Sequence, residues 1–213
     1  MEINMTIELL HYEADAAGVI FPAKTFIIEE ESSLIIISPG PLNSLTIDRL
    51  TKTKKELIFI APNNFHNLYL KSMCDTFPHA KFYGPKRAAK VSGVPLLNTK
   101  EFSSPNIETV YIEGNNSLSE TCFYYKPEKT LIVTDLFFNM NHDMNIMTKL
   151  MMKIAGAYKK LAMSRIIKFS IKDKNLFNRS LQRLADLDFK KVIPNHGDSI
   201  SKELFIKTFV NKK

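Results

Sequence analysis

Two histidines and one aspartate each follow an apolar run that is typical of a buried strand. His66 comes after Leu57 to Ile60, Asp135 after Leu131 to Val133, and His196 after Val192 and Ile193. Polar residues just beyond the ends of strands build the sites of layered α/β proteins, so these three side chains are candidates to converge. Two imidazoles and one carboxylate can hold zinc or ferrous iron and leave a coordination position open for catalysis.

Other common catalytic chemistries lack their motifs in this chain. The sequence has no Gly-x-Ser-x-Gly elbow, no Gly-x-x-x-x-Gly-Lys loop and no Gly-x-Gly-x-x-Gly turn, and only seven glycines in all. Cys74 and Cys122 are the only cysteines, and neither has metal-ligand spacing, so we expect two reduced, apolar side chains. Serine hydrolysis, nucleotide-loop chemistry and a structural zinc knuckle are therefore poor hypotheses.

Two further groups contain metal-ligand residue types. His11, Glu13 and Asp15 alternate, so on a strand they would share one face, although a polar outer face is the commoner explanation. His142 lies seven residues beyond Asp135 and could line the mouth of a site. An exposed histidine beside an N-capping Asn141 or Asp143 is the alternative.

The elements that must position the site alternate between strands and helices in two similar halves. The composition, with 45% apolar and 24% charged side chains over 213 residues, is that of a folded globular protein. No linker rich in Gly, Ser or Pro separates the halves, which predicts a single α/β domain over 1–213. The expected strands are 18–21, 25–28, 34–37, 57–60, 81–83, 109–112, 121–125, 130–133 and 190–193, and the expected helices are 42–50, 67–76, 86–91, 143–169, 173–187 and one from Ser201.

Three of these segments together resemble the metallo-β-lactamase superfamily. The stretch from Phe21 to Pro39 is similar to the family's opening strands, Thr130 to Phe138 to its metal-bridging Asp segment, and Val192 to Gly197 to its last metal-ligand motif. They occur in the family's order over nearly all of the chain. The resemblance implies an α/β fold of the four-layered αββα sandwich type, made of two similar halves.

The chain departs from the family's pattern at the main metal signature. Where the family has His-x-His-x-Asp-His, the chain has residues 61–66, with Ala61 and Asn63 in place of the first two histidines, Phe65 in place of the aspartate, and only His66 kept. The later Gly-His motif becomes Gly114-Asn115. The resemblance therefore implies an atypical branch in which the first metal position has lost its imidazoles.

What the resemblance leaves is a reduced, at most mononuclear metal site. His66, Asp135 and His196 would hold one zinc or iron ion, and Asn63 and Asn115 would orient water or substrate. The implied activity is that of a metal-dependent hydrolase, in which the metal lowers the pKa of a bound water. The alternative is a non-catalytic binding or assembly protein of the same fold that has lost the metal centre, with the three residues making hydrogen bonds instead.

The basic charge is concentrated in one helical region. The whole chain carries +7, but residues 149–191 hold twelve basic and three acidic residues. Such a region near a site would attract an anionic small-molecule substrate. The basic residues of the chain are 24 Lys and only five Arg, which argues against nucleic acid as the partner.

The same region is a Met-rich helical insertion, about 143–187. Six of the nine methionines fall between Met140 and Met163. Packing against the core is the default role, and a lid, a homodimer face or a lipid-touching helix are the alternatives. The first ten residues lack the pattern of a signal peptide, and no apolar run is long enough for a membrane span, so we expect a cytoplasmic protein.

Overall fold

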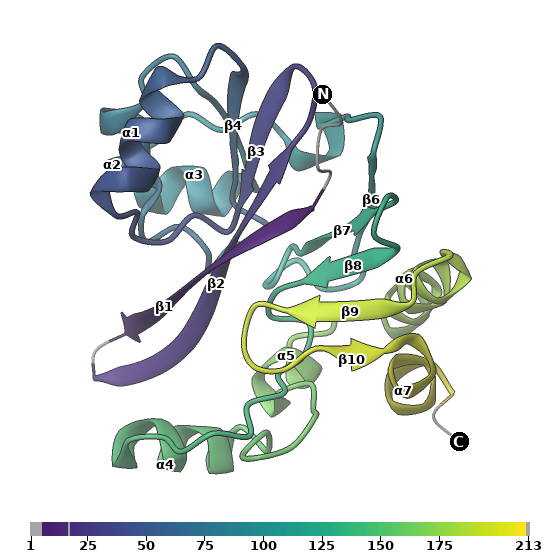
Figure 1. Cartoon of the computed structure of the whole chain (residues 1–213). Helices are drawn as coiled ribbons and strands as arrows, with labels where there is room; N and C mark the ends of the chain where they lie inside the picture. Colours follow the sequence, from purple (N-terminus) through teal and green to yellow (C-terminus); the bar gives the residue numbers. More distant parts are fainter. Residues whose placement is uncertain (1–5, 17, 212–213) are drawn as a thin grey trace. The chain divides into compact units, whose positions relative to one another are not determined.

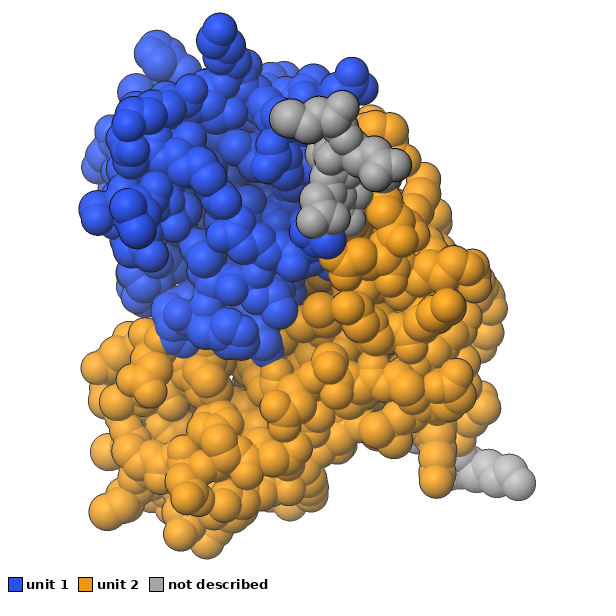
Figure 2. Space-filling view, viewed as in Figure 1, with its two compact units in different colours: residues 1–12, 24–102 blue, residues 13–23, 103–213 orange. Residues whose placement is uncertain are grey.

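The computed structural model describes residues 6–16 and 18–211. Backbone contacts divide the chain into two compact units (Figure 2). Unit 1 consists of Met1–Tyr12 and Lys24–Phe102, and unit 2 of Glu13–Ala23 and Ser103–Lys213. Each unit is described by itself below.

Unit 1 is built on a five-stranded sheet with strands in the order β1-β2-β3-β4-β5 (Figure 1). Strand β3 is antiparallel to β2 and parallel to β4, and β5 extends the parallel part. Helices α1, α2 and α3 lie on one face of this sheet. The elements are β1 (Ile7–Ala16), β2 (Val19–Glu29), β3 (Ser33–Ile37), α1 (Ser44–Lys52), β4 (Glu56–Ile60), α2 (Leu70–Thr76), β5 (Lys81–Tyr83), α3 (Lys86–Ser92) and the short 3-10 helix η1 (Thr99–Glu101). Residues 13–16 of β1 and 19–23 of β2 belong to unit 2.

The apolar runs of the sequence become the core strands of unit 1. All five residues of β3 are buried, as is typical of a strand covered on both faces. On the helix side, Phe59 of β4 stacks with Phe77 and Phe82 at ring-centroid distances of 5.4 and 5.2 Å. The Asn43 side chain accepts the Thr46 N–H and so caps α1, which fixes where the chain leaves the sheet.

Unit 2 repeats the architecture with the strand order β10-β9-β8-β7-β6. Strand β9 is parallel to β8, and the other neighbouring pairs are antiparallel. Its core packs buried strand residues against Phe177, Leu181 and Phe205 of the C-terminal helices. The elements are β6 (Ile107–Tyr111), β7 (Thr121–Tyr125), β8 (Thr130–Val133), α4 (Ile146–Ile154), α5 (Arg165–Phe169), α6 (Lys174–Asp186), β9 (Lys191–Pro194), β10 (Ile200–Ser201), α7 (Lys202–Phe205) and the π-helical turn η2 (Ile206–Val210).

The predicted α/β class is confirmed, and each unit is a sheet with helices on one face, as one half of the predicted sandwich requires. Two element predictions are wrong. The strands expected at 18–21 and 25–28 are one continuous strand, β2. The helix expected over 143–169 is broken, because Gly156 takes a left-handed φ of 70° after α4 and Ser164 caps a new helix, α5.

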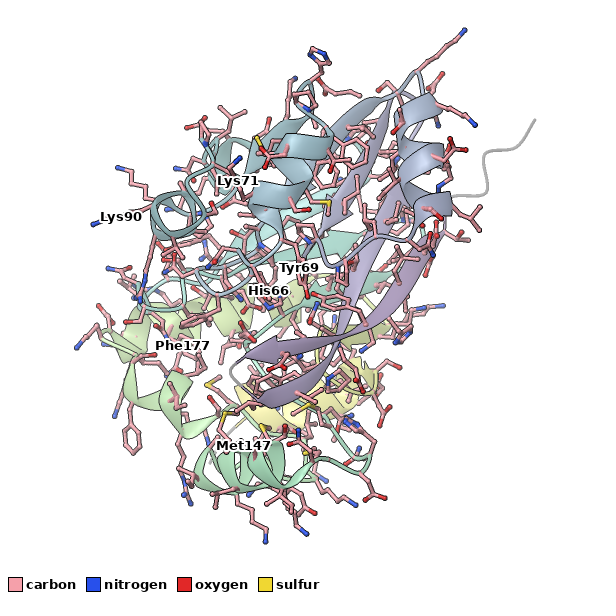
Figure 3. All side chains as sticks on the ribbon, turned by 90° about the vertical axis from the view of Figure 1, so that its left-hand side faces the viewer. His66, Tyr69, Lys71, Lys90, Met147 and Phe177 are labelled. Atoms are coloured by element: carbon pink, nitrogen blue, oxygen red, sulfur yellow. The ribbon has the colours of Figure 1, made fainter. Side chains whose placement is uncertain are left out.

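Both cysteines are free thiols, as the sequence predicted. In the part of the chain that the structure describes, no helix has the length and apolar character needed to cross a membrane. The methionines of the insertion divide between two roles, since Met152 is buried in a small cluster with the preceding Met140, while Met147 on α4 is 54% exposed (Figure 3).

Candidate functional site

Asp135 lies directly after β8, and a buried carboxylate holds its backbone. The Glu120 side chain accepts the N–H of Thr134 at 2.7 Å and the N–H of Asp135 at 2.9 Å. Glu120 is completely buried in the loop before β7. The two charge-assisted hydrogen bonds fix the direction in which the chain leaves β8, and with it the place of the Asp135 side chain.

The surroundings of Glu120 make its ionisation unfavourable. Burial, and then the negative charge of Asp135, raise the pKa of Glu120 to about 7, and the two backbone N–H donors oppose that rise. The Cys122 thiol lies 3.9 Å from the same carboxylate. Burial raises the pKa of Cys122 well above its usual range, so this thiol stays protonated and unreactive.

His196 follows β9, the parallel neighbour of β8. Its Nδ1 lies 2.8 Å from the Pro22 carbonyl oxygen, which can only accept, so Nδ1 carries a proton and donates to that oxygen. The imidazole stacks on Phe138 at 5.3 Å between ring centroids, and Phe21 contacts it at 5.7 Å. These contacts fix both the plane and the tautomer of the ring.

Asp135 and His196 form a buried pair within unit 2. Asp135 Oδ1 lies 3.4 Å from His196 Nε2, with side chains 11% and 9% exposed. With Nδ1 facing the Pro22 carbonyl, Nε2 is the ring nitrogen that faces the carboxylate oxygen. A proton on Nε2 or a metal ion bound by both groups would join them, and an imidazole nitrogen beside a carboxylate oxygen is a donor set that fits a metal ion.

The turn after His196 requires glycine. Gly197 has a φ of 98°, and a Cβ there would lie 2.1 Å from the Asn139 carbonyl oxygen. The close approach allows the Asn139 N–H to donate to the His196 carbonyl oxygen at 3.1 Å. The segment after Asp135 is thereby joined to the segment that carries His196.

In unit 1, His66 pairs with Ser38 at the carboxyl ends of β3 and β4. The Ser38 hydroxyl lies 2.7 Å from His66 Nδ1. Ser38 has a φ of 56°, unusual for a residue with a side chain, and its N–H donates to the Ile60 carbonyl oxygen at 2.9 Å. A residue held in this conformation at a strand end is typical of functional sites.

The two asparagines predicted to orient water or substrate bond to the protein itself. Asn63 is buried, and its Oδ1 accepts the N–H of Phe65 at 2.7 Å and of His66 at 3.2 Å, which forms the turn that carries His66. Asn115 Nδ2 donates to the Ile167 carbonyl oxygen at 3.2 Å and to Ser170 at 3.0 Å. A direct role of either amide on water or substrate stays a prediction.

Of the predicted ligands, the structure brings Asp135 and His196 together in unit 2 and places His66 in unit 1. Sequence reasoning missed Glu120 and the Pro22 carbonyl. A lone carboxylate directly before the apolar strand β7 was the available signal for Glu120. The sequence carries no signal for a contact that is made by a backbone carbonyl.

His142 is exposed, and the N-cap of α4 is Asn145 rather than Asn141 or Asp143.

No family model matches the sequence, and a comparison with curated proteins found no match. Solved structures do match. A metallo-β-lactamase from Pontibacter korlensis is 14% identical, with a TM-score of 0.61 over 96% of this chain and 94% of that one. The metallo-β-lactamase FIM-1 from Pseudomonas aeruginosa, in its mono-zinc form, is 11% identical, with a TM-score of 0.62 over 95% of this chain and 89% of that one. At such identities the likeness concerns the fold.

Proposed function

We propose that this chain, whose fold is that of the metallo-β-lactamases, binds a single zinc or iron ion and acts as a metal-dependent hydrolase when loaded. The ligands in this proposal are His66, Asp135 and His196. A similar fold whose structure is in a mono-zinc form makes a one-metal site reasonable for such a scaffold.

The Asp135–His196 pair is the observation that carries the proposal. The tautomer of His196 is set by the Pro22 carbonyl, and the backbone of Asp135 is set by Glu120. Metal-ligating histidines commonly donate their other N–H to a carbonyl or carboxylate, which orients the ring and raises its basicity.

His66 is proposed as the third ligand from the order of the segments in the sequence. It follows the carboxyl end of β4, as Asp135 and His196 follow β8 and β9. The Ser38 hydroxyl at Nδ1 resembles the partner that orients a ligating histidine. We propose positioning roles for Asn63, which shapes the turn before His66, and for Asn115, which bonds to the end of α5.

A metal bound by two imidazoles and one carboxylate would supply a water of lowered pKa, about 7 in well-studied sites. The chain's own contribution is to hold the ligands and restrict water, since Asp135 and His196 are about nine-tenths buried. An anionic small molecule is the proposed substrate class, because the formal charge of +7 attracts anions to the protein.

Metal analysis of protein purified without chelator tests the proposal. We expect the purified protein to contain close to one equivalent of zinc or iron. Adding metal to the stripped protein at about a hundred times its Kd should raise the free energy of unfolding by about 2.7 kcal/mol, and the Tm by several degrees. Less than roughly a tenth of an equivalent together with no thermal shift would contradict it. That outcome would favour the alternative, a non-catalytic binding or assembly protein of this fold.

A further inference from the structure

The outer face of α4 is apolar and exposed. Ile146, Met147, Leu150 and Ile154 are 87%, 54%, 55% and 65% exposed. Spaced at three and four residues, they form one continuous stripe along the helix. The opposite face, with Thr148 and Met152, is buried against unit 2. The helix therefore has a packed face and a second apolar face that the described chain leaves exposed, at the edge of unit 2 (Figure 1).

Basic side chains surround this stripe. Residues 144–172 contain seven basic residues and no acidic one. Lys149 and Lys153 flank the stripe, and both ammonium groups lie over the Tyr158 ring, 5.9 and 5.4 Å from its centroid. Within residues 6–16 and 18–211, Lys159 is the only one of the seven with an acidic partner in an ion pair, Asp143 at 2.8 Å. The segment is therefore strongly cationic.

The neighbouring helix α5 has the same character. Its first residue lies beside the C-terminus of α4, since the Arg165 N–H donates to the Ala155 carbonyl oxygen at 2.8 Å. Ile166 and Phe169 are 61% and 84% exposed, and Arg165 and Lys168 are exposed beside them. Two short helices in succession thus present large apolar side chains together with cations.

We propose that α4, assisted by α5, docks unit 2 onto an anionic lipid bilayer. Amphipathic helices that lie in the membrane interface combine buried Leu, Ile or Phe with Lys at the level of the headgroups. The long lysine stems suit this placement, because the ammonium can stay at the headgroups while the stem lies along apolar surface. Peripheral attachment through such a face requires no membrane-spanning helix.

The charge and side-chain types favour a bilayer over two other partners. A second copy of the chain meeting the same face would bring two cationic segments together, which is repulsive. A nucleic acid would gain from arginines and stacking aromatic rings, whereas this stripe is aliphatic and the segment has a single arginine. This membrane role is independent of a bound metal.

Sedimentation of the full chain with vesicles, in the presence of a chelator, tests the proposal. We expect binding to phosphatidylcholine vesicles with roughly a third phosphatidylserine, weaker binding to pure phosphatidylcholine, and a loss of binding in high salt. The double variant Leu150→Gln/Ile154→Gln should bind at least about tenfold more weakly, since two apolar side chains no longer enter the bilayer. Because both side chains are exposed, the variant should fold normally.

Leu45→Gln is the matched control, because Leu45 on α1 is 80% exposed and lies outside this segment. It should bind vesicles as the wild type does. Failure to bind the anionic vesicles overturns the proposal, as does equal loss in the control and the α4 variant. A concentration-dependent dimer that Leu150→Gln abolishes, without vesicle binding, would assign the face to a second copy instead. Since chelator is present throughout, these outcomes are distinct from failure of the metal site.

Discussion

Asp135 Oδ1 lies 3.4 Å from His196 Nε2, and the other ring nitrogen of His196 donates to the Pro22 carbonyl oxygen. A carboxylate oxygen and an imidazole nitrogen thus face each other in a buried part of unit 2. A metal ion bound by both residues would use this arrangement.

Substitution of either residue of the pair should remove most of the metal affinity. His196→Ala removes a nitrogen ligand, and Asp135→Asn keeps the shape of the side chain but removes its charge, so zinc affinity should fall by at least about tenfold in each. Calorimetric titration of the metal-free protein with zinc measures the affinity. His142→Ala is the control, because His142 is exposed. Unchanged affinity in both site variants would exclude them as ligands.

His66 and Ser38 test the contribution of unit 1. We expect His66→Ala to weaken zinc binding more than Ser38→Ala. For Ser38→Ala we expect the zinc affinity to fall by about 10- to 100-fold, as is typical when a residue that orients a metal ligand is removed. His79→Ala, an exposed histidine of the same unit, should have no effect. If His66→Ala binds zinc as tightly as His79→Ala, the third ligand must be sought elsewhere.

Glu120 should make the stability of the metal-free protein depend on pH. Its pKa is raised from 4.5 to about 7 in the folded chain, so the folded state binds the proton more strongly than the unfolded state. The resulting stabilisation is complete below pH 4.5 and is lost as the pH rises to 7, a change of about 3 kcal/mol.

Urea unfolding in chelator at pH 5 and pH 7.5 measures this effect. Because glutamine does not titrate, the stability of wild type relative to Glu120→Gln should decrease between the two pH values, by roughly 2 to 3 kcal/mol. Glu108→Gln is the control, since Glu108 is exposed. The same difference at both pH values would show that Glu120 does not change its protonation on folding.

Gly197 should tolerate no side chain. Gly197→Ala places a Cβ 2.1 Å from a backbone oxygen at a φ of 98°, so we expect a loss of more than about 3 kcal/mol in the free energy of unfolding. Gly93→Ala is the matched control. Gly93 has a φ of 70° with no atom within 4 Å of the new Cβ, so only about 1 kcal/mol of backbone strain should appear. Equal losses would mean that the Asn139 contact is not tight.

Much of the fold could be predicted because buried strands are continuous apolar runs. The runs before Asp135 and His196 became β8 and β9, and their parallel pairing, with Thr130 opposite Lys191, brings the residues that follow them together. Hydrophobic periodicity did not predict the break in the helix expected over 143–169. Apolar residues continue at helical spacing there, although the left-handed backbone of Gly156 ends the helix. Hydrophobic spacing carries no information about a single left-handed residue.

The candidate site could be predicted only in part. The proposed ligands are His and Asp residues that follow predicted strands, so they can be identified from the sequence. The groups that orient them can be identified poorly or not at all. Pro22 acts through a carbonyl that every residue has, and Glu120 lies fifteen positions from the amide that it holds. Asn63 was predicted to orient water or substrate, and that role stays a prediction; the structure adds that its side chain forms the turn before His66.

The hydrogen bond between His196 and Pro22 joins residues 174 positions apart. Consequently, the orientation of one of the three proposed ligands depends on segments that are far apart in the sequence, and a growing chain on the ribosome cannot complete this contact until β9 has emerged. A fragment that starts after β2, or stops before β9, would contain Asp135 without the correctly oriented imidazole. Metal loading should therefore be a late event in biosynthesis and a report on whether the Pro22 and His196 segments of unit 2 have come together.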